Sequence, residues 1–234
     1  MKIENSVALV TGANRGLGKV LTTALLDAGA AKVYATARNT STITDPRLTP
    51  LRMDITDPAS VAAAAATARD VTLLINNAGI STGTRILDSE AGLRQELEAN
   101  YLGPVSVARE FAPILGANGG GALVNVLSVL SWITGERFAG YSSAKAAMWS
   151  ATNALRLTLQ DQGTLVTAVH VGYLDTDMAA KVTAPKIAPQ VVADAILRAV
   201  AAGDREVLVD DLSRNVRAAL SGPLEALYPT LANA

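Results

Sequence analysis

The stretch Val7-Ala8-Leu9-Val10-Thr11-Gly12-Ala13-Asn14-Arg15-Gly16-Leu17-Gly18 decides how this chain folds. Its first five residues form an apolar run without polar alternation, as expected of a strand that is buried on both faces. A helical run follows the glycines, from Lys19 to Ala28, and Gly29 closes it. This order favours a phosphate-binding turn, because glycines let the backbone approach a pyrophosphate and a helix N-terminus offers free N–H groups. A plain turn between a strand and a helix is the alternative.

Strand-like and helical runs alternate along the rest of the chain. The alternation predicts a parallel sheet with helices on both faces, which is a Rossmann-type doubly wound α/β fold. The chain has no internal repeat and no long linker, so residues 1–234 are expected to form a single domain. Further strands are expected at 31–37, 51–54, 71–75, 123–126, 165–169 and 206–209. Further helices are expected from Pro58, at 84–117 with interruptions near Gly103-Pro104 and Pro113, at 141–159 and at 191–201, with a loop or short helix at 179–189.

Composition narrows the class of protein. Half of the 234 residues are apolar and 18% are charged, so the chain can build a substantial core. The net charge of −1 gives no general attraction to nucleic acid or to an anionic membrane. The absence of cysteine and the single histidine argue against a metal site. Without a signal-peptide pattern or an apolar run of about 18 residues, the sequence predicts a cytoplasmic protein that binds neither nucleic acid nor membrane.

The end of the second predicted strand, Tyr34 to Asn39, bears on the choice of dinucleotide. A unit that binds NAD usually has an acidic residue about 20 residues after the glycine turn, which binds the ribose 2′-hydroxyl. This chain has no acid there; it has Arg38, and Arg15 lies inside the glycine turn. A guanidinium suits a phosphate better than a hydroxyl. The pair favours NADP(H) over NAD(H), with solvated surface charges as the plainer interpretation of each arginine.

Tyr141 and Lys145 stand four residues apart at the start of a predicted helix, so they share one helix face. Moving a phenol pKa from about 10 to neutrality requires about 3 units, or roughly 4 kcal/mol. One cation at about 4 Å, at an effective dielectric constant near 20, supplies a comparable energy. The pair is therefore a candidate acid/base, although the same spacing also occurs by chance in surface helices.

Taken together, these residues resemble the short-chain dehydrogenase/reductase superfamily, in its shorter single-domain branch, over nearly all of the chain up to about residue 180. The run from Thr11 to Gly18 is similar to the family's Thr-Gly-x-x-x-Gly-x-Gly, and Asn76-Asn77-Ala78-Gly79 matches its Asn-Asn-Ala-Gly. Ser128 precedes Tyr141 by thirteen residues, the family's usual gap. Asn100 falls where the family has a helix asparagine, and Asp54 fits its adenine-contacting acid.

The resemblance implies hydride transfer between a nicotinamide and a carbonyl or alcohol carbon. In that reaction Tyr141 donates a proton to the carbonyl oxygen, and Ser128 stabilises the charge that develops there. Lys145 lowers the pKa of Tyr141 and binds the nicotinamide ribose, while Asn100 holds a water of a proton relay. The implied cofactor-binding residues are Gly12, Asn14, Arg15, Gly16, Leu17, Gly18, Arg38, Asp54, Ile55, Asn77, Ala78, Gly79, Tyr141, Lys145, Gly172, Leu174 and Thr176.

Two regions depart from the family pattern. Val171 stands where the family commonly has a proline before Gly172, which frees the φ angle and adds an N–H. This substitution leaves the stiffness of the loop open but does not affect the chemistry. From Glu206 onward the chain also fits the family less well, which leaves its subunit contacts open.

Several residues near the expected site have plainer interpretations. His170 is expected to close a strand, since the acid/base position is already filled, and Ser131 and Ser142 lack the spacing of Ser128 to Tyr141. Asp175 and Asp177 offer too few oxygens for a hard cation and are expected to be solvated loop charges. Trp149 is expected to pack or to contact a neighbouring subunit. The residues that either line a substrate pocket or belong to the core are Leu130, Trp132, Ile133, Tyr173, Met178 and Val182.

The sequence thus predicts an NADPH-dependent carbonyl reductase that acts on a small-molecule ketone or aldehyde. A homodimer or homotetramer that packs through the apolar 146–151 face is expected. One alternative is an NAD(H)-dependent alcohol dehydrogenase of the same fold. A second is a non-catalytic dinucleotide-sensing protein. The motifs do not define the substrate, the stereopreference or the direction of the reaction, because variable loops set them.

Overall fold

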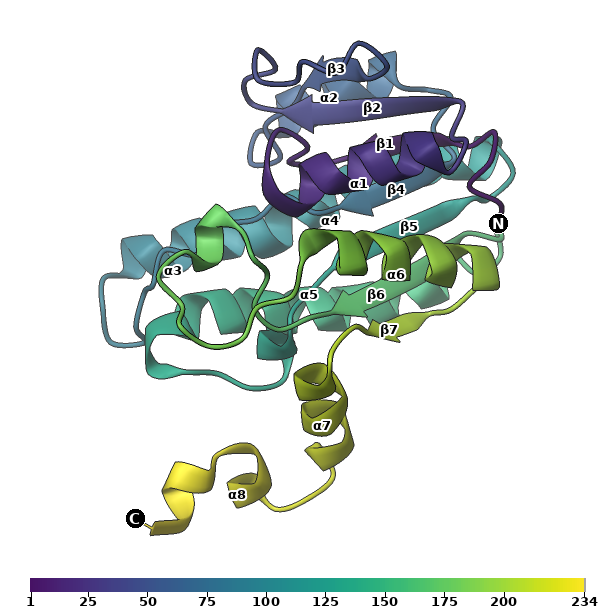
Figure 1. Ribbon diagram of the computed structural model, residues 1–234. Helices are drawn as coiled ribbons and strands as arrows, with labels where there is room; N and C mark the ends of the chain where they lie inside the picture. Colours follow the sequence, from purple (N-terminus) through teal and green to yellow (C-terminus); the bar gives the residue numbers. More distant parts are fainter. Residues whose placement is uncertain (234) are drawn as a thin grey trace.

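The seven strands of the computed structural model, which describes residues 1–233, form one parallel sheet (Figure 1). The strands lie in the order β3-β2-β1-β4-β5-β6-β7, and every neighbouring pair runs parallel. They are β1 (Val7–Val10), β2 (Lys32–Ala37), β3 (Thr49–Arg52), β4 (Leu73–Asn76), β5 (Ala122–Val126), β6 (Leu165–His170) and β7 (Glu206–Leu208). The prediction of a Rossmann-type doubly wound α/β fold is confirmed.

The order of strands reverses direction between β1 and β4. The chain runs outward from β1 through β2 to β3, then returns to β4 on the other side of β1 and continues outward to β7. In an open parallel sheet, ligands bind in the crevice beyond the carboxyl ends of the strands at such a point. The glycine turn follows β1, and Asn77 to Gly79 follow β4. Both predicted cofactor segments therefore meet at this crevice.

Helices cover both faces of the sheet (Figure 1). Helices α1 (Gly16–Asp27) and α6 (Pro189–Ala202) pack on one face, and α2 (Pro58–Thr67), α4 (Gly103–Ala117) and α5 (Ala139–Thr158) on the other. Helix α3 (Glu90–Leu97) packs against α5. After β7, α7 (Asp211–Ala219) and α8 (Leu224–Leu227) lead away from the sheet.

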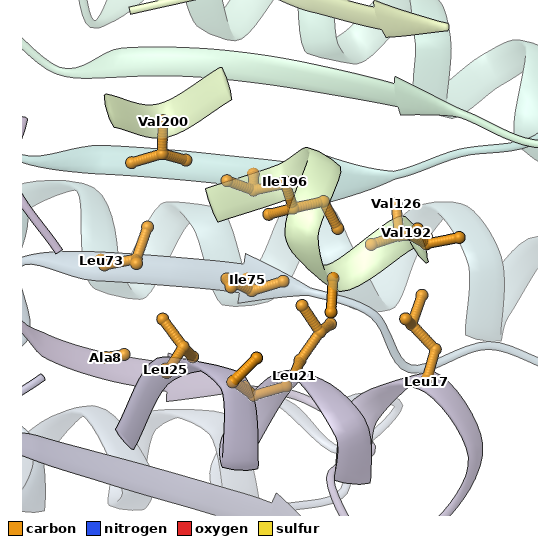
Figure 2. Close-up of a cluster of buried hydrophobic side chains, with 14 of the residues drawn as sticks. Ala8, Leu17, Leu21, Leu25, Leu73, Ile75, Val126, Val192, Ile196 and Val200 are labelled. Atoms are coloured by element: carbon orange, nitrogen blue, oxygen red, sulfur yellow. The ribbon is translucent and has the colours of Figure 1, made fainter. Parts of the chain in front are cut away.

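The larger core lies between α1, α6 and the sheet, where Figure 2 shows the two helices facing each other over the strands. Leu21 and Leu25 of α1 are fully buried against Ile196 of α6 and Ile75 of β4. Burial of each such side chain stabilises the fold by about 1.5–3 kcal/mol. The core thus holds the first turn of α1 firmly beneath the crevice, next to the glycine turn.

Most predicted elements are found within three residues of their expected ends, and two strands are shifted by two residues. The third strand was expected at 51–54 and ends at Arg52, so Asp54 lies beyond it; the fourth was expected at 71–75 and begins at Leu73. In both places strand pairing, rather than apolar character, sets the boundary. Thr72, next to the fourth strand, instead binds the backbone of Val7 through its side chain and its N–H.

The predicted 84–117 helical region needs two corrections. Residues 84–89 are not helical, and the predicted break around Pro113 is absent. The interruption expected near Gly103-Pro104 is a π-helical turn, Glu98–Leu102, that lies between α3 and α4 and ends directly before Gly103. Pro104 is tolerated because it occupies the first turn of α4, where an N–H needs no intrahelical partner. Pro113 lies inside α4 without ending it.

Among residues 1–233, no helix combines the length and the apolar character that crossing a membrane requires.

Candidate active site

Thr11 locks the turns after β1 and β4 together. Its hydroxyl accepts hydrogen bonds from the backbone N–H groups of Asn77 and Ala78, both at 2.9 Å. The side-chain amide of Asn77 donates in return to the carbonyl oxygens of Thr11 at 2.8 Å and of Gly12 at 3.3 Å. The two segments that resemble the family's cofactor motifs are thereby held as one rigid floor to the crevice.

The glycines of the first turn are required by close approach. A Cβ at Gly18 would lie 2.1 Å from the Gly12 carbonyl oxygen, and one at Gly12 would lie 3.0 Å from the Ala78 Cα. Gly16 has a φ of +52° and begins α1. Arg15 occupies the N-cap position of α1, but its side chain makes no hydrogen bond to the helix. The first N–H groups of α1 therefore receive no hydrogen bond from the capping side chain. Such a turn fits a pyrophosphate, which needs bare backbone and free N–H groups.

A cavity of about 630 Å³ opens over this floor. Every residue that the resemblance implied for cofactor binding lines it, from Gly12 to Thr176, and Ser128 does so as well. Of the candidate substrate-pocket residues, Leu130, Ile133, Tyr173, Met178 and Val182 line the cavity, whereas Trp132 does not. Phe138, Ile80 and Leu212 also line it and were not singled out from the sequence.

Basic and acidic side chains flank the end of the cavity near β2. Arg38 follows this strand, and its guanidinium lies near Asp54. Burial raises the pKa of Asp54, but hydrogen bonds from Thr56 and the charges of Arg38 and Arg52 outweigh this effect and leave it below its ordinary value. Across the mouth, Arg15 is only loosely paired with Asp177, at 3.6 Å, with both side chains mostly exposed. Exposed pairs of this kind are weak, so both guanidinium groups are free to meet an anion.

Tyr141 and Lys145 lie on the first two turns of α5, with Lys145 buried and Tyr141 partly exposed. The Lys145 Nζ atom lies 5.6 Å from the centre of the Tyr141 ring and donates to the carbonyl oxygen of Val126 at 2.8 Å. This carbonyl belongs to the last residue of β5, two residues before Ser128. The sheet therefore fixes the ammonium beneath the phenol.

The pKa values depart from the expectation for this pair. Burial raises the pKa of Tyr141 to about 12, a hydrogen bond with Ser128 lowers it, and the charge of Glu96 raises it further. Burial also lowers the pKa of Lys145 to about 8. The expected net lowering of the phenol pKa is therefore wrong, since the pKa is raised overall. Burial disfavours both charged forms and is the largest cause of each shift, and the ammonium is directed at a carbonyl oxygen.

Ser128 is placed by the end of the fifth strand and by the backbone that follows the sixth. Its hydroxyl accepts from the N–H of Leu130 at 3.1 Å and lies 3.4 Å from the carbonyl oxygen of Val171, while it also hydrogen-bonds Tyr141. The Val171 carbonyl in addition accepts from Val129 N–H at 3.0 Å. Val171 is buried in the core, so packing and these bonds hold the position where the family has proline.

Asn100 lies in the π-helical turn and is buried. Its amide group donates to the carbonyl oxygens of Ile80 at 2.9 Å and Glu96 at 3.0 Å, and its Oδ1 atom accepts from Ile80 N–H at 3.0 Å. It does not line the cavity. The side chain thus holds the turn after Gly79 and keeps one lone pair of Oδ1 for a further partner.

His170 ends β6, as predicted, and supports the Ser128 loop from below. It is fully buried, stacks on Trp132 with ring centres 3.8 Å apart, and places Nδ1 3.2 Å from the Ser128 carbonyl oxygen. A carbonyl oxygen can only accept, so Nδ1 carries the proton. Burial lowers the pKa of His170 to about 4, so the ring is neutral near pH 7.

Asp210 and Tyr228, which both follow β7, hold this side of the cavity. The sequence analysis did not identify either residue. Asp210 accepts from the N–H of Gly172 and from that of Ser213, both at 2.6 Å, so it fixes the loop after β6 while it caps α7. The Tyr228 hydroxyl accepts from Thr134 N–H at 3.0 Å. An acid three residues before a serine, ahead of an amphipathic run, could have predicted the cap, but no local signal predicts the contact with Gly172.

Known proteins are similar to this chain in sequence. A sequence model of the family described as "short chain dehydrogenase" matches residues 6–187. A short-chain dehydrogenase of Penicillium ochrochloron is 34% identical over 185 residues, which are 74% of this chain and 68% of that protein. A 1-deoxy-11-beta-hydroxypentalenate dehydrogenase of Streptomyces exfoliatus is 31% identical over 202 residues, which are 80% of this chain and 74% of that protein.

Among solved structures, a short chain dehydrogenase from Burkholderia cenocepacia in complex with NADP is 40% identical, with a TM-score of 0.94 and 99% of each chain covered. A short chain dehydrogenase/reductase from Burkholderia phymatum in complex with NAD has a TM-score of 0.83 at 22% identity and covers 93% of each chain. At that identity the second likeness concerns the fold alone.

Proposed function

The chain belongs to the short-chain dehydrogenase family, and on that premise we propose that it reduces the carbonyl group of a ketone or aldehyde with NADPH. One observation carries the proposal: the phenol of Tyr141, the hydroxyl of Ser128 and the ammonium of Lys145 meet at the cavity that the glycine turn borders. The nicotinamide, when bound, supplies the hydride that reaches the carbonyl carbon. The remaining steps belong to the chain's own side chains.

Tyr141 acts as the proton donor. With its pKa raised to about 12, the phenol stays protonated through neutral pH and can give its proton to the carbonyl oxygen as charge develops there. Ser128 hydrogen-bonds the same oxygen and stabilises this charge. Its oxygen is held beside the phenol, because it accepts from the Leu130 N–H and donates to the Val171 carbonyl oxygen.

Lys145 and Asn100 support the donor. The buried ammonium of Lys145 favours the phenolate that remains after proton transfer, since opposite charges close together stabilise each other. A proton then returns to Tyr141 along a relay in which Lys145 takes part, with a water bound at the free lone pair of Asn100 Oδ1. Val126 and the turn at Ile80 hold the two side chains in place.

The choice of NADP(H) rests on Arg15 and Arg38. No acidic residue follows β2 directly. Among residues 1–233, Arg15 is only loosely paired with Asp177 and Arg38 forms no ion pair, and both arginines line the cavity. A 2′-phosphate would give them a charge-assisted partner, whereas a 2′-hydroxyl would not. The NADP held by the similar Burkholderia cenocepacia protein supports this choice.

The substrate is proposed to be a small or medium-sized apolar carbonyl compound. Next to the catalytic side chains, the cavity is lined by apolar and aromatic groups from three segments of the chain. They are Leu130, Ile133, Phe138, Tyr173, Met178, Val182 and Leu212. Such a lining favours apolar compounds through burial of their surface.

We further propose that the whole chain acts as one NADP(H)-binding domain in a homodimer or homotetramer. The 146–151 face of α5 borders a groove that also includes Tyr101 and Val105 from the π-turn and α4. Helix packing across this groove would bury its apolar surface. Sedimentation velocity would report the mass: a monomer at micromolar concentration contradicts the proposed assembly.

Two measurements test the function. Titration of NADPH and NADH should give tighter binding of NADPH, and Arg38→Asp should weaken NADPH by about 10- to 100-fold, corresponding to about 1.5–3 kcal/mol. Arg198→Asp, an exposed arginine of α6 away from the cavity, is the matched control. If wild type and Arg38→Asp each bind NADPH and NADH equally well, the NAD(H)-dependent alcohol dehydrogenase is favoured instead.

The second measurement is turnover of a panel of apolar and polar ketones and aldehydes with each cofactor. The proposal predicts NADPH oxidation with at least one apolar carbonyl compound. Tight NADPH binding without oxidation across the panel would contradict reduction and favour the dinucleotide-sensing alternative.

A further inference from the structure

A buried carboxylate that takes no part in the proposed reaction lies beside the catalytic helix. Glu96, in the last turn of α3, has a fully buried side chain. Its Oε1 atom accepts from the N–H of Thr82 at 2.6 Å. Its Oε2 atom is buried and has no hydrogen-bond partner within the described residues 1–233. Burial of a charged group without a partner is costly, so a carboxylate in this position calls for a compensating role.

The unpartnered oxygen lies against the residue before the catalytic tyrosine. A Cβ at Gly140 would be 2.1 Å from Glu96 Oε2, so only glycine leaves room for the carboxylate. Gly140 does not have a positive φ, which means that close approach alone, and not backbone conformation, demands glycine here. Glu96 and Gly140 are therefore complementary, and Tyr141 is the next residue along the helix.

The carboxylate also lies at the positive end of α5. Phe138, which precedes the helix, makes no side-chain capping hydrogen bond, and the first turn of α5 has no acidic residue of its own. A negative charge near a helix N-terminus is stabilising. Glu96 supplies that charge from a neighbouring helix, which offsets part of the cost of its burial.

Glu96 also holds a wall of the cavity. Through Thr82 it fixes the segment that follows Ile80 and Ser81, two residues that line the cavity. The hydroxyl groups of Thr82 and Thr84 lie 2.5 Å apart, and the Thr84 carbonyl oxygen accepts from Gly140 N–H at 3.4 Å. One side chain thus joins the cavity wall to the first turn of the catalytic helix.

We propose that Glu96 is a positioning residue that joins the 80–84 segment to the first turn of α5 and places a negative charge against Gly140, the residue before Tyr141. The inference rests on the proposed role of Tyr141 as proton donor. The charge acts in the same direction as burial, which has the larger effect, and both favour the protonated phenol that reduction requires. It also explains why glycine stands before the tyrosine.

The charges around this pair are consistent with the role. The charge of Glu96 raises the pKa of Tyr141, in addition to the larger effect of burial, while Ser128 opposes both. Lys145 is the cation on the same helix, but its ammonium is directed to the Val126 carbonyl. The other charged groups nearby form exposed pairs with each other, namely Arg85 with Glu136 and Arg94 with Glu90. The remaining titratable groups on the packed elements and the segments next to them are Asp88, Glu98, Tyr101, Arg137 and, in the last turn of α5, Arg156.

The first test replaces the charge and keeps the shape. Glu96→Gln retains an oxygen for Thr82 N–H, so the fold should hold, while the pKa of Tyr141 should fall by about one unit. Phenolate absorbance, taken as the difference from the same protein carrying Tyr141→Phe, would report this titration without any turnover. Glu98→Gln, an exposed neighbour, is the control and should leave the titration unchanged. An unchanged titration in Glu96→Gln overturns the charge role.

The second test asks whether Glu96 and Gly140 act as a pair. Gly140→Ala should lower the thermal unfolding midpoint and shift the Tyr141 titration, because its methyl group displaces the carboxylate. In the double variant with Glu96→Ala the space is free, and most of the loss in unfolding midpoint should be recovered. Equal losses in both backgrounds would overturn the proposed contact.

These readouts separate the inference from the proposed function. A protein that reduces no carbonyl compound can still show the titration shift and the Glu96–Gly140 coupling, and an active protein can lack both. In an active protein, Glu96→Gln should further shift the pH profile of alcohol oxidation to lower pH by about one unit, with KM changed little because the wall contact to Thr82 remains.

Discussion

The two sides of the cavity are held by different kinds of contact. The glycine-turn side, residues 11–18 and 76–79, is fixed by backbone atoms at close approach and by Thr11, whose hydroxyl joins the two turns. The Ser128 side, residues 128–138 and 170–182, is fixed by single side chains from distant parts of the chain, above all His170 and Asp210.

This difference shows where the choice of residue is narrow and where it is wide. A pyrophosphate is recognised by N–H groups and bare backbone, which leave little choice of residue. A substrate pocket requires only that some scaffold hold the loops, and any side chain that reaches them will serve. The glycine-turn side therefore carries two contiguous family motifs, Thr11–Gly18 and Asn76–Gly79, while the loops beyond Ser128 also depend on this chain's own C-terminal segment, including α7.

The largest effect of a substitution on stability and on NADPH binding is expected on the glycine-turn side, at Gly18. In Gly18→Ala the added Cβ would lie 2.1 Å from the Gly12 carbonyl oxygen and 2.6 Å from Asn77 Nδ2. The turn must deform, so we expect a loss of about 3 kcal/mol in the free energy of unfolding and loss of NADPH binding in calorimetry.

Gly135→Ala on the Ser128 side is the matched control, because its Cβ would meet only a ring atom of Phe138 at 3.3 Å, and a side chain can move. Similar losses in both variants would show that the two sides are equally rigid, which would contradict the proposed difference between them.

The Ser128 side should respond to acid through His170. Its pKa is lowered from 6.5 to about 4 when folded, so the unfolded chain binds a proton that the folded chain does not. The corresponding stability is present above pH 6.5 and is lost as the pH falls toward 4, by up to about 3 kcal/mol.

Urea unfolding of wild type and His170→Asn across this range would measure the effect. The stability difference between the two proteins should shrink by that amount from pH 7 to pH 4. A difference that is constant with pH would mean that His170 does not titrate on unfolding as described.

A smaller effect is expected at Asp210. Asp210→Ala removes the N-cap of α7 and leaves the Gly172 N–H without its acceptor, which should cost about 2 kcal/mol of stability. Because the loop after β6 would then shift, kcat/KM should fall about tenfold. Asp211→Ala, at a residue whose side chain is 90% exposed and paired only with Arg214, is the control. Equal effects of the two variants would contradict the role of Asp210 in holding the loop after β6.

The sequence predicted the elements of the glycine-turn side more completely than those of the Ser128 side, for a physical reason. Strand, turn and helix from Val7 to Asp27 are encoded by neighbouring residues, so their pattern can be read directly. The contact of Asp210 with Gly172 spans 38 residues, and that of Glu96 with Gly140 spans 44, so no local pattern specifies either. The tertiary structure was needed to find both.

The direction of the Tyr141 pKa shift was missed for the same reason. The spacing to Lys145 indicates a cation one turn away, but the depth of burial and the orientation of the ammonium depend on the whole sheet. Strand ends at Arg52 and Leu73 were likewise set by pairing with neighbouring strands. Apolar character alone placed them two residues away.

The most direct test of the proposed chemistry is the single-turnover rate of carbonyl reduction by NADPH-loaded Tyr141→Phe. Removal of one hydroxyl group keeps the ring and its packing, so NADPH should bind as in wild type and the unfolding midpoint should change little. We expect the rate to fall by about 10²- to 10⁴-fold, the usual contribution of a positioned proton donor. A rate within a few-fold of wild type, at unchanged NADPH affinity, would contradict the assignment of Tyr141 as the proton donor.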